Sequence, residues 1–248
     1  EEGVNMSDAI DVFDIHSHIM EDYKKFVGSF INIRDETIKK EVDKGIAAGK
    51  FWPEPLIRFN PSFTKGKSLQ QLCHEGIIHP EMTEIFDGFE LYKHQADAIE
   101  IGCRGDDFVV TSGTGSGKSL AFLATICDYL LKHKKDKGSG TIGIKAVIVY
   151  PMNALINSQL EAIKELKNRY ETQTGKEFPF SFAQYTGQER QEERENIRRE
   201  LPDIILTNYM MLELILTRPQ ENMLRDSLYE NLKYLVFDEL HTYRGRQG

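Results

Sequence analysis

The sequence predicts an α/β fold in which a parallel β-sheet lies between layers of helices. Two observations lead to this fold class. From about residue 86 onward, short apolar runs alternate with longer segments of helical spacing. The apolar runs show no alternation with polar residues, which is typical of strands buried on both faces. The expected strands are residues 108–110, 146–150, 180–183, 203–206 and 234–237.

The composition is that of an ordinary globular protein, with 40% hydrophobic and 28% charged residues among 248. The sequence contains no run of 18 apolar residues, the length that a membrane-spanning helix needs. Its acidic N-terminus is unlike a secretory signal. The three cysteines form no CxxC pair, which favours a reducing, cytoplasmic setting. A net charge of −8 argues against a dedicated nucleic-acid-binding module, since these are usually basic. It does not argue against a protein that contacts phosphates through a few amides and hydroxyls.

The chain is expected to divide into a mostly helical N-terminal extension, residues 1–85, and the α/β domain, residues 86–248. Apolar residues recur at roughly helical intervals within residues 31–46. Two closely spaced X-Pro steps around Trp52 predict an extended connector, with Trp52 as a packing anchor. Residues 132–140 are rich in lysine and glycine and are expected to form a solvated loop.

A glycine-rich segment, residues 111–119, follows the first expected strand and opens a helix expected at residues 120–131. In this context glycines allow consecutive backbone N–H groups to surround phosphate oxygens, and the helix N-terminus adds a favourable dipole. Lys118 is expected to reach the β and γ phosphates of a nucleotide, and the Ser119 hydroxyl to hold Mg²⁺. The expected nucleotide-binding residues of this loop are Ser112, Gly113, Thr114, Gly115, Ser116, Gly117, Lys118 and Ser119.

An acidic pair follows the last expected strand directly, in the run Asp-Glu-Leu-His at residues 238–241. A carboxylate at the carboxyl end of a buried strand faces the ligand crevice of an open α/β sheet. Asp238 is expected to position Mg²⁺, mostly through water. Glu239 is expected to orient and deprotonate the attacking water, and His241 to couple the nucleotide state to the rest of the protein. Lys118 and Asp238 should therefore meet at neighbouring strand ends.

Together the two motifs resemble the DExH-box branch of the superfamily 2 helicases, in its DELH form. Ser112 strengthens the resemblance, because these helicases carry a small residue where the general phosphate-binding loop has glycine. The resemblance covers residues 88–248 and implies a RecA-like domain. Tyr-Pro-Met-Asn-Ala-Leu at residues 150–155 and Asp-Glu-Leu-His-Thr-Tyr-Arg-Gly at residues 238–245 are similar to Hrq- and MrfA-type DNA repair helicases and to helicases of antiphage systems such as DISARM and Druantia.

The resemblance implies roles for five further residues. Gln95 lies in a segment that looks like the Q-motif, whose glutamine reads adenine and makes ATP the expected nucleotide. Tyr92 is either a stacking partner for that base or a core residue. Asn153 in the motif Ia region, Thr186 in the Ib region and Thr207 in the Ic region are expected to bind the nucleic-acid backbone. Each of these three could also be a simple turn residue.

The resemblance also implies what lies outside these residues. The family has a second RecA-like domain that supplies arginines across the nucleotide cleft, and this sequence ends soon after Asp238, after motif II. Such an arginine contributes about 10³–10⁵ in rate, so this chain alone is expected to bind ATP weakly and turn it over poorly. The expected partners are DNA (a single strand or a duplex with a tail), the second RecA-like domain, and subunits of a defence or repair complex, with no membrane.

Three other interpretations stay open. The chain could belong to a P-loop ATPase that switches or assembles without moving nucleic acid, or to an RNA helicase. The run Phe13–His18 also resembles the HxH metal motif of amidohydrolase and phosphoesterase barrels. His16 and His18 would share one face of a strand and could hold a metal there. The surrounding residues favour a helix, and no such barrel follows.

Overall fold

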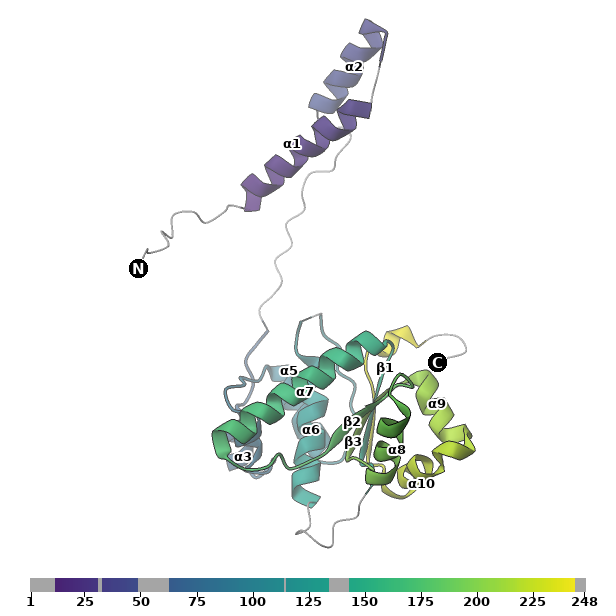
Figure 1. Cartoon of the computed structure of the whole chain (residues 1–248). Helices are drawn as coiled ribbons and strands as arrows, with labels where there is room; N and C mark the ends of the chain where they lie inside the picture. The colour runs from purple at the N-terminus through teal and green to yellow at the C-terminus, as the bar shows by residue number, and fades with distance from the viewer. Residues whose placement is uncertain (1–11, 31–32, 49–62, 114, 134–142, 244–248) are drawn as a thin grey trace, which may run out of the picture. The chain divides into compact units, whose positions relative to one another are not determined.

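The computed structural model describes residues 12–30, 33–48, 63–113, 115–133 and 143–243. It divides into two compact units, residues 1–61 and residues 62–248 (Figure 1). Trp52 and its neighbouring prolines, Thr114, and most of the lysine-rich segment 132–140 lie outside the described residues. No helix in the described ranges is long and apolar enough to cross a membrane.

The first unit contains two helices, α1 (Val12–Phe30) and α2 (Glu36–Ala47), neither of which buries a residue. The carboxylate of Asp35 begins α2 by accepting hydrogen bonds from the backbone N–H groups of Thr37 and Ile38. His16 and His18 lie in α1, where residues two apart point to different sides of the helix. The metal interpretation of the HxH run is therefore wrong, and the described residues contain no group of three or more potential metal ligands.

The second unit is built on a four-stranded parallel sheet with the order β2-β3-β1-β4. Because every strand runs in the same direction, all four carboxyl ends lie at one edge of the sheet. The central strand β1 is buried at every position, as its unbroken apolar sequence predicts. The strands are β1 (Ala146–Tyr150), β2 (Phe182–Tyr185), β3 (Ile204–Asn208) and β4 (Tyr234–Phe237).

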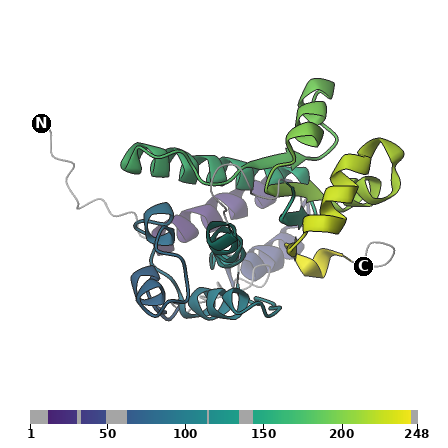
Figure 2. The ribbon, with the colours of Figure 1, turned by 90° about the horizontal axis from the view of Figure 1, so that it is seen from below.

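Helices cover both faces of this sheet, so the predicted fold class is confirmed. Ile148 and Tyr150 of β1 belong to one apolar cluster with residues of helices α3 to α7, and Val147 and Val149 belong to a second cluster with α9 and α10. The blue-to-teal helices and the yellow-green helices accordingly lie on different sides of the view in Figure 2. The bounds are α3 (Leu69–His74), α4 (Met82–Ile85), α5 (Lys93–Cys103), α6 (Lys118–His133), α7 (Asn153–Thr174), α8 (Gln191–Glu200), α9 (Tyr209–Thr217), η1 (Pro219–Glu221), α10 (Asn222–Asn231) and η2 (Leu240–Thr242).

The prediction of a strand at residues 108–110 is wrong. These residues form no ladder with any described strand. Phe108 instead packs against α5, where its ring lies so close to Gly102 that a β-carbon there would meet it at 2.8 Å. Val109 is 76% exposed. The segment therefore lacks the two-sided burial that its apolar sequence predicts.

Two other strands begin and end later than predicted. The structure has β2 at Phe182–Tyr185 where the sequence predicts residues 180–183, and β3 at Ile204–Asn208 where it predicts residues 203–206. Phe180 is buried like a strand residue, but it packs against Phe178 in the segment before β2, with ring centroids 4.4 Å apart. Apolar content thus locates a strand better than it locates the strand's ends.

Residues 62–85, predicted as part of the N-terminal extension, belong to the compact second unit. Helices α3 and α4 contribute Leu72, Met82 and Ile85, which are fully buried in the cluster that also contains Ile148. The short helix α3 carries a capping box in which Ser68 and Gln71 bond each other's backbone N–H groups. The division of the chain into functional domains stays a prediction.

Candidate nucleotide and nucleic-acid site

The glycine-rich loop leads into α6, which begins at Lys118, two residues earlier than predicted. Gly115 and Gly117 have φ values of 75° and 69°, a conformation that glycine adopts without strain. The Lys118 ammonium folds back over the loop and donates to the carbonyl oxygens of Ser112 at 3.1 Å and Gly113 at 3.3 Å. The loop thus has the backbone conformation of a phosphate-binding loop, and the Lys118 ammonium is hydrogen-bonded to its carbonyl oxygens.

Three serine side chains lie in or directly after this loop. The hydroxyls of Ser112 and Ser116 are hydrogen-bonded to each other across the turn. Ser119 lies in the first turn of α6 and is partly exposed, so its hydroxyl is near the helix N-terminus where an anion is favoured.

Gln95 is 3% exposed and braces the glycine-rich loop. Its amide nitrogen donates to the carbonyl oxygens of Ser116 at 3.3 Å and Gly117 at 2.9 Å, and its oxygen accepts from the Tyr92 backbone N–H at 2.8 Å. A β-carbon at Gly117 would meet the Gln95 amide nitrogen at 2.5 Å, so glycine is required there. Both amide hydrogens are used by the loop, and adenine recognition by Gln95 requires one of these bonds to be exchanged.

Tyr92 caps α5 and belongs to a small group of rings. Its ring is stacked on His94, with centroids 5.9 Å apart, and lies 5.2 Å from the ring of Phe63. The His94 imidazole also approaches the Ser116 carbonyl oxygen at 3.0 Å. This contact joins the aromatic group to the loop, which leaves both predicted roles of Tyr92 open.

The acidic pair lies directly after β4. The Asp238 backbone N–H donates to the Val149 carbonyl at 2.9 Å and so extends the ladder between β4 and β1 by one bond. Glu239 is one of two non-glycine residues in the described ranges with positive φ, at 50°. Backbone in this region is strained and is often found at functional sites. The Glu239 carboxylate contacts His241 Nδ1 at 3.3 Å.

Electrostatics link the acidic pair to the loop. Burial raises the pKa of the Asp238 carboxyl above its usual value, and the charge of Lys118 acts on the same carboxyl in the opposite sense. Lys118 is therefore near enough to Asp238 for its charge to act on that carboxyl. The meeting of the two residues at neighbouring strand ends stays a prediction, because residues 108–110 form no strand in the described part of the chain.

The donor groups at this edge fit a magnesium ion. Mg²⁺ is usually held by one or two protein oxygens together with phosphates and water. A site of this kind needs no cluster of three protein ligands, and the described residues contain none. The Asp238 carboxylate and the Ser119 hydroxyl are the oxygen ligands that this chain would contribute.

Asn153 lies at the start of α7, at the same edge of the sheet. Its side-chain oxygen accepts a hydrogen bond of 2.8 Å from the Asn208 amide, and the Asn208 oxygen in turn caps α9 by accepting from the Met211 N–H. The pair holds two helix N-termini side by side, a geometry suited to anions. Asn208 is a site residue that sequence reasoning passed over in favour of its neighbour Thr207, although asparagine is a strong N-cap signal.

Thr207 is not available to a ligand in this structure. It is fully buried, and its hydroxyl donates to the Tyr185 carbonyl oxygen at 2.6 Å. Because side chains alternate along a strand, Thr207 and Asn208 point to opposite faces of the sheet, and only Asn208 reaches the helix N-termini at its edge. The predicted phosphate contact of Thr207 therefore has no support from the geometry.

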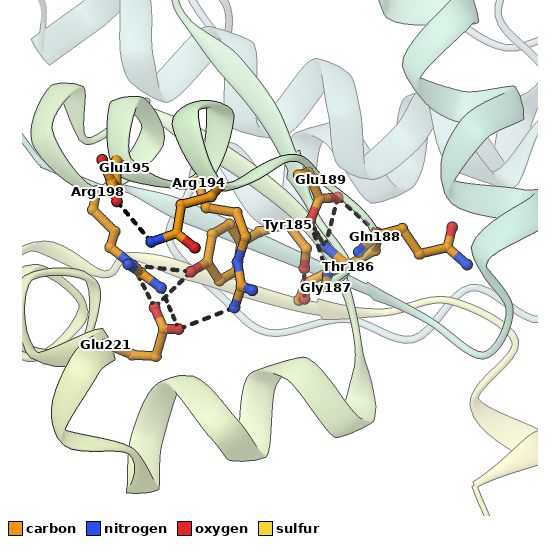
Figure 3. Close-up of polar contacts among 11 residues, drawn as sticks. Tyr185, Thr186, Gly187, Gln188, Glu189, Arg194, Glu195, Arg198 and Glu221 are labelled. Atoms are coloured by element: carbon orange, nitrogen blue, oxygen red, sulfur yellow. Dashed lines mark hydrogen bonds and ion pairs between the residues drawn. The ribbon is translucent and has the colours of Figure 1, made fainter.

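Thr186 lies in a turn after β2, and a carboxylate already occupies its donors (Figure 3). Glu189 accepts from the Thr186 hydroxyl at 2.6 Å, from the Thr186 N–H at 2.9 Å and from the Gly187 N–H at 2.8 Å. The turn is thus an anion-binding group of three donors, as its predicted role requires, but the bound anion is part of the chain.

A buried ion-pair cluster supports this turn from the side (Figure 3). Glu221 is 2% exposed and binds Arg198 at 2.7 Å, Arg194 at 3.4 Å and the hydroxyl of Tyr185, the residue before the turn. Burial would raise the pKa of the Glu221 carboxyl, but the hydrogen bonds from Arg198 and Tyr185 lower it below its usual value. The cluster ties α8 and η1 to the end of β2. Residues 188–195 carry dense charges of both signs, which is typical of an exposed helix, but Arg194 of this run belongs to the cluster and is only partly exposed.

Fold and site together define a class: an α/β nucleotide-binding domain with a phosphate loop and an acidic pair at the carboxyl edge of a parallel sheet. Within that class, residues 92–248 match the DEAD/DEAH box helicase family. This match covers more than half of the chain. The chain therefore belongs to the DEAD/DEAH box helicase family.

Three curated relatives refine this assignment. An uncharacterized ATP-dependent helicase of Methanocaldococcus jannaschii is 35% identical over 68% of this chain. The Druantia protein DruE of Escherichia coli is 29% identical over 76% of it, and the ATP-dependent helicase HRQ1 of Saccharomyces cerevisiae is 31% identical over 71%. The matches span only 23%, 11% and 15% of the respective relatives.

Solved structures agree with the fold. The helicase MrfA bound to DNA and AMPPNP matches 82% of this chain and 26% of its own, with a TM-score of 0.60 and 24% identity. MrfA bound to DNA alone matches 75% of this chain and 22% of its own, with a TM-score of 0.58 and 27% identity. The resemblance to superfamily 2 helicases and to the Hrq, MrfA and Druantia subgroup is confirmed.

Proposed function

We propose that this chain is the ATP-binding half of a motor that moves along DNA, as a helicase or a translocase. The observation that carries the proposal is that the charge of Lys118, in the glycine-rich loop, acts on the Asp238 carboxyl directly after β4, although the two residues are far apart in the sequence. A lysine in a glycine-rich loop and a carboxylate at a neighbouring strand end are the two parts that hold a nucleoside triphosphate in this class of protein.

The residues would divide the chemistry as follows. Lys118 would exchange its bonds to the loop carbonyls for bonds to the β and γ phosphates of ATP. Ser119 and Asp238 would hold Mg²⁺, which neutralises charge on those phosphates when bound. Glu239, strained and next to Asp238, would orient the attacking water and accept its proton. His241, in contact with Glu239, would sense the state of this site.

DNA is the favoured nucleic acid for two reasons. Two structures of MrfA are of complexes with DNA, and Asn153 and Thr186, which follow β1 and β2, are the residues that we propose to contact the nucleic-acid backbone. The relatives HRQ1 and DruE make DNA repair and antiphage defence the two proposed settings, with a second RecA-like domain and complex subunits as further partners. An RNA helicase and an ATPase that only switches remain as alternatives.

The nucleotide part of the proposal is tested by the variant K118A. Binding of a fluorescent ATP analogue to the chain in the presence of Mg²⁺ should fall by at least about 100-fold, because the variant loses the only cation within reach of the phosphates in the described part of the loop. K164A, which changes a lysine that forms only an exposed ion pair on α7, is the control and should bind normally. Equal binding by K118A and the unchanged chain would remove the nucleotide site.

The nucleic-acid part is tested in a protein that joins this chain to a second RecA-like domain. ATP hydrolysis should rise on addition of single-stranded DNA and rise less with RNA of the same length. Greater stimulation by RNA would establish the RNA helicase alternative. Hydrolysis that responds to neither would leave the switching ATPase. Brisk DNA-stimulated hydrolysis by the 248 residues alone would contradict the need for a second domain.

A further inference from the structure

The turn at residues 186–189 binds an anion that belongs to the chain itself (Figure 3). Both oxygens of the Glu189 carboxylate take part: Oε1 accepts from the Thr186 hydroxyl and N–H, and Oε2 accepts from the Gly187 N–H at 2.8 Å. The Thr186 hydroxyl also accepts from the Gln188 N–H at 3.4 Å. The groups predicted to bind a nucleic-acid phosphate are therefore the groups that bind Glu189.

The backbone of the turn is shaped to present these donors. Gly187 has a φ of 86°, and a β-carbon there would meet the Met211 sulfur at 3.0 Å, so both strain and packing require glycine. A residue in this conformation after an ordinary one aligns successive N–H groups toward one point, which creates an anion-binding concavity. Gly187 and Gln188 are exposed whereas Thr186 is only 7% exposed, so the concavity opens to solvent on its Gly187 side.

Glu189 is a close chemical substitute for a phosphodiester. Each group spreads one negative charge over two oxygens that accept hydrogen bonds, and each is bound through the same N–H and O–H donors. Glu189 forms no ion pair with any described Lys, Arg or His. The nearby arginines Arg194 and Arg198 are engaged by Glu221 instead. The charge of Glu189 is therefore balanced chiefly by the three donors of the turn.

We propose that Glu189 is an internal competitor that occupies the phosphate site of the Thr186 turn until a nucleic-acid phosphate displaces it. The inference rests on the proposed function, because the displacing ligand is the backbone of a bound DNA strand. On binding, the carboxylate leaves the turn for solvent and one phosphate takes its three donors. The affinity of the chain for DNA is thus lower than the donors alone would provide, and Glu189 determines by how much.

The test compares two substitutions that remove the same charge from the same region. E189Q replaces the carboxylate with a neutral amide of equal size, which binds the donors of the turn more weakly. E195Q removes a charge from the exposed face of α8, where the Glu195 carboxylate accepts a hydrogen bond from Gln191. Binding of a fluorescently labelled oligothymidine to each chain is measured by anisotropy across a series of salt concentrations.

E189Q should bind the oligonucleotide about 3- to 10-fold more tightly than E195Q, the effect of one charge-assisted hydrogen bond to phosphate that no longer competes with a carboxylate. The slope of log affinity against log salt should be the same for E189Q and E195Q, because both complexes contain the same phosphate contacts and both variants have lost one negative charge. E189A should behave like E189Q, and the double variant T186V/E189Q should bind no more tightly than E195Q because the hydroxyl donor is absent.

Two results would overturn the inference while leaving the proposed function intact. One is equal affinity of E189Q and E195Q for the oligonucleotide at every salt concentration. The other is weaker DNA binding by both E189Q and E189A with unchanged binding of the ATP analogue, since Glu189 would then only hold the loop in shape. If the unchanged chain and all variants fail to bind the oligonucleotide at low salt, the proposed function is itself wrong and the inference falls with it.

Discussion

Two loops of the second unit each bind a charged side chain of their own, and the two charges have opposite signs. In the glycine-rich loop, the ammonium of Lys118 rests on carbonyl oxygens of its own loop. In the turn after β2, the carboxylate of Glu189 rests on N–H groups of its own turn. The first loop carries a cation that can swing directly to a phosphate, whereas the second must release an anion first. A ligand phosphate is attracted by one and initially repelled by the other.

The largest effect that separates the two loops should come from E239Q. Glu239 is proposed as the base that accepts a proton from water during ATP hydrolysis. The rate of ATP hydrolysis by the two-domain protein should therefore fall by about 10²–10⁴ in this variant. Binding of ATP and of DNA should stay near normal, because the amide keeps the shape of the carboxylate. Steady-state hydrolysis and analogue binding measure the two quantities. Retained turnover would exclude Glu239 as the base and weaken the distinction between the loops.

The second loop should depend on the buried cluster beside it. E221Q leaves Arg194 and Arg198 without their carboxylate, and removing one partner of a buried ion pair costs about 3–5 kcal/mol. The arginines are partly exposed, so the lower end of that range is expected. Urea denaturation at neutral pH measures the loss. E213Q, which changes an exposed glutamate of α9, should cost little.

The stability difference between the unchanged chain and E221Q should depend on pH in a definite direction. The pKa of Glu221 is lowered in the folded state, so the carboxylate contributes stability at pH values above its unfolded value, near 4.5. That contribution is lost as the pH falls through the folded value. The stability difference between the unchanged chain and E221Q should therefore be full at about pH 7 and shrink below about pH 4.5. A difference that grows in acid would contradict the assigned ion pair.

A smaller effect, confined to the first loop, is expected from Q95A. The substitution removes the bonds from Gln95 to the Ser116 and Gly117 carbonyls, which keep His94 and the Leu120 N–H as partners. It leaves the Tyr92 N–H without the Gln95 oxygen, at a cost of about 1–3 kcal/mol if that group stays buried. Affinity for the ATP analogue should fall as well, because the loop loses its brace. Q71A is the matched control: Gln71 caps α3 in the same way but lies in a different part of the unit. If Q71A weakened nucleotide binding as much, the brace would have no special role.

The smallest effect is expected from Y150F. Tyr150 is fully buried at the end of β1, and its hydroxyl has no hydrogen-bond partner among the described residues. Removing an unbonded buried hydroxyl should leave the melting temperature unchanged or raise it. Y170F should lower it, because the Tyr170 hydroxyl binds Glu81. A clear loss of stability in Y150F would show that the hydroxyl is bonded in solution.

The sequence was most informative where local chemistry and burial agree. The five apolar residues of β1 and the acidic pair after β4 were predictable, because two-sided burial and a charged strand end each leave a direct pattern. The role of Thr207 was not, since the side of the strand on which it lies depends on the register with β2. The bonds from Gln95 to the loop join segments 21 and 22 residues apart, and no spacing rule predicts them.

The failed prediction at residues 108–110 has the same origin. Tertiary contacts decide whether an apolar run joins a sheet. Phe108 finds an apolar neighbour in α5 without entering the sheet, and Val109 does not. Composition alone does not distinguish these outcomes, because the choice is made by tertiary contacts.

One of the two outer strands of the sheet, β4, affects how this chain of 248 residues behaves in solution. Among the described residues, β4 pairs with β1 and with no strand on its other side, and Leu235 and Phe237 are 48% and 39% exposed. Unprotected strands with apolar side chains promote association between molecules. A solution of the isolated chain is therefore expected to form oligomers as its concentration rises, and light scattering across a dilution series should accompany every binding measurement.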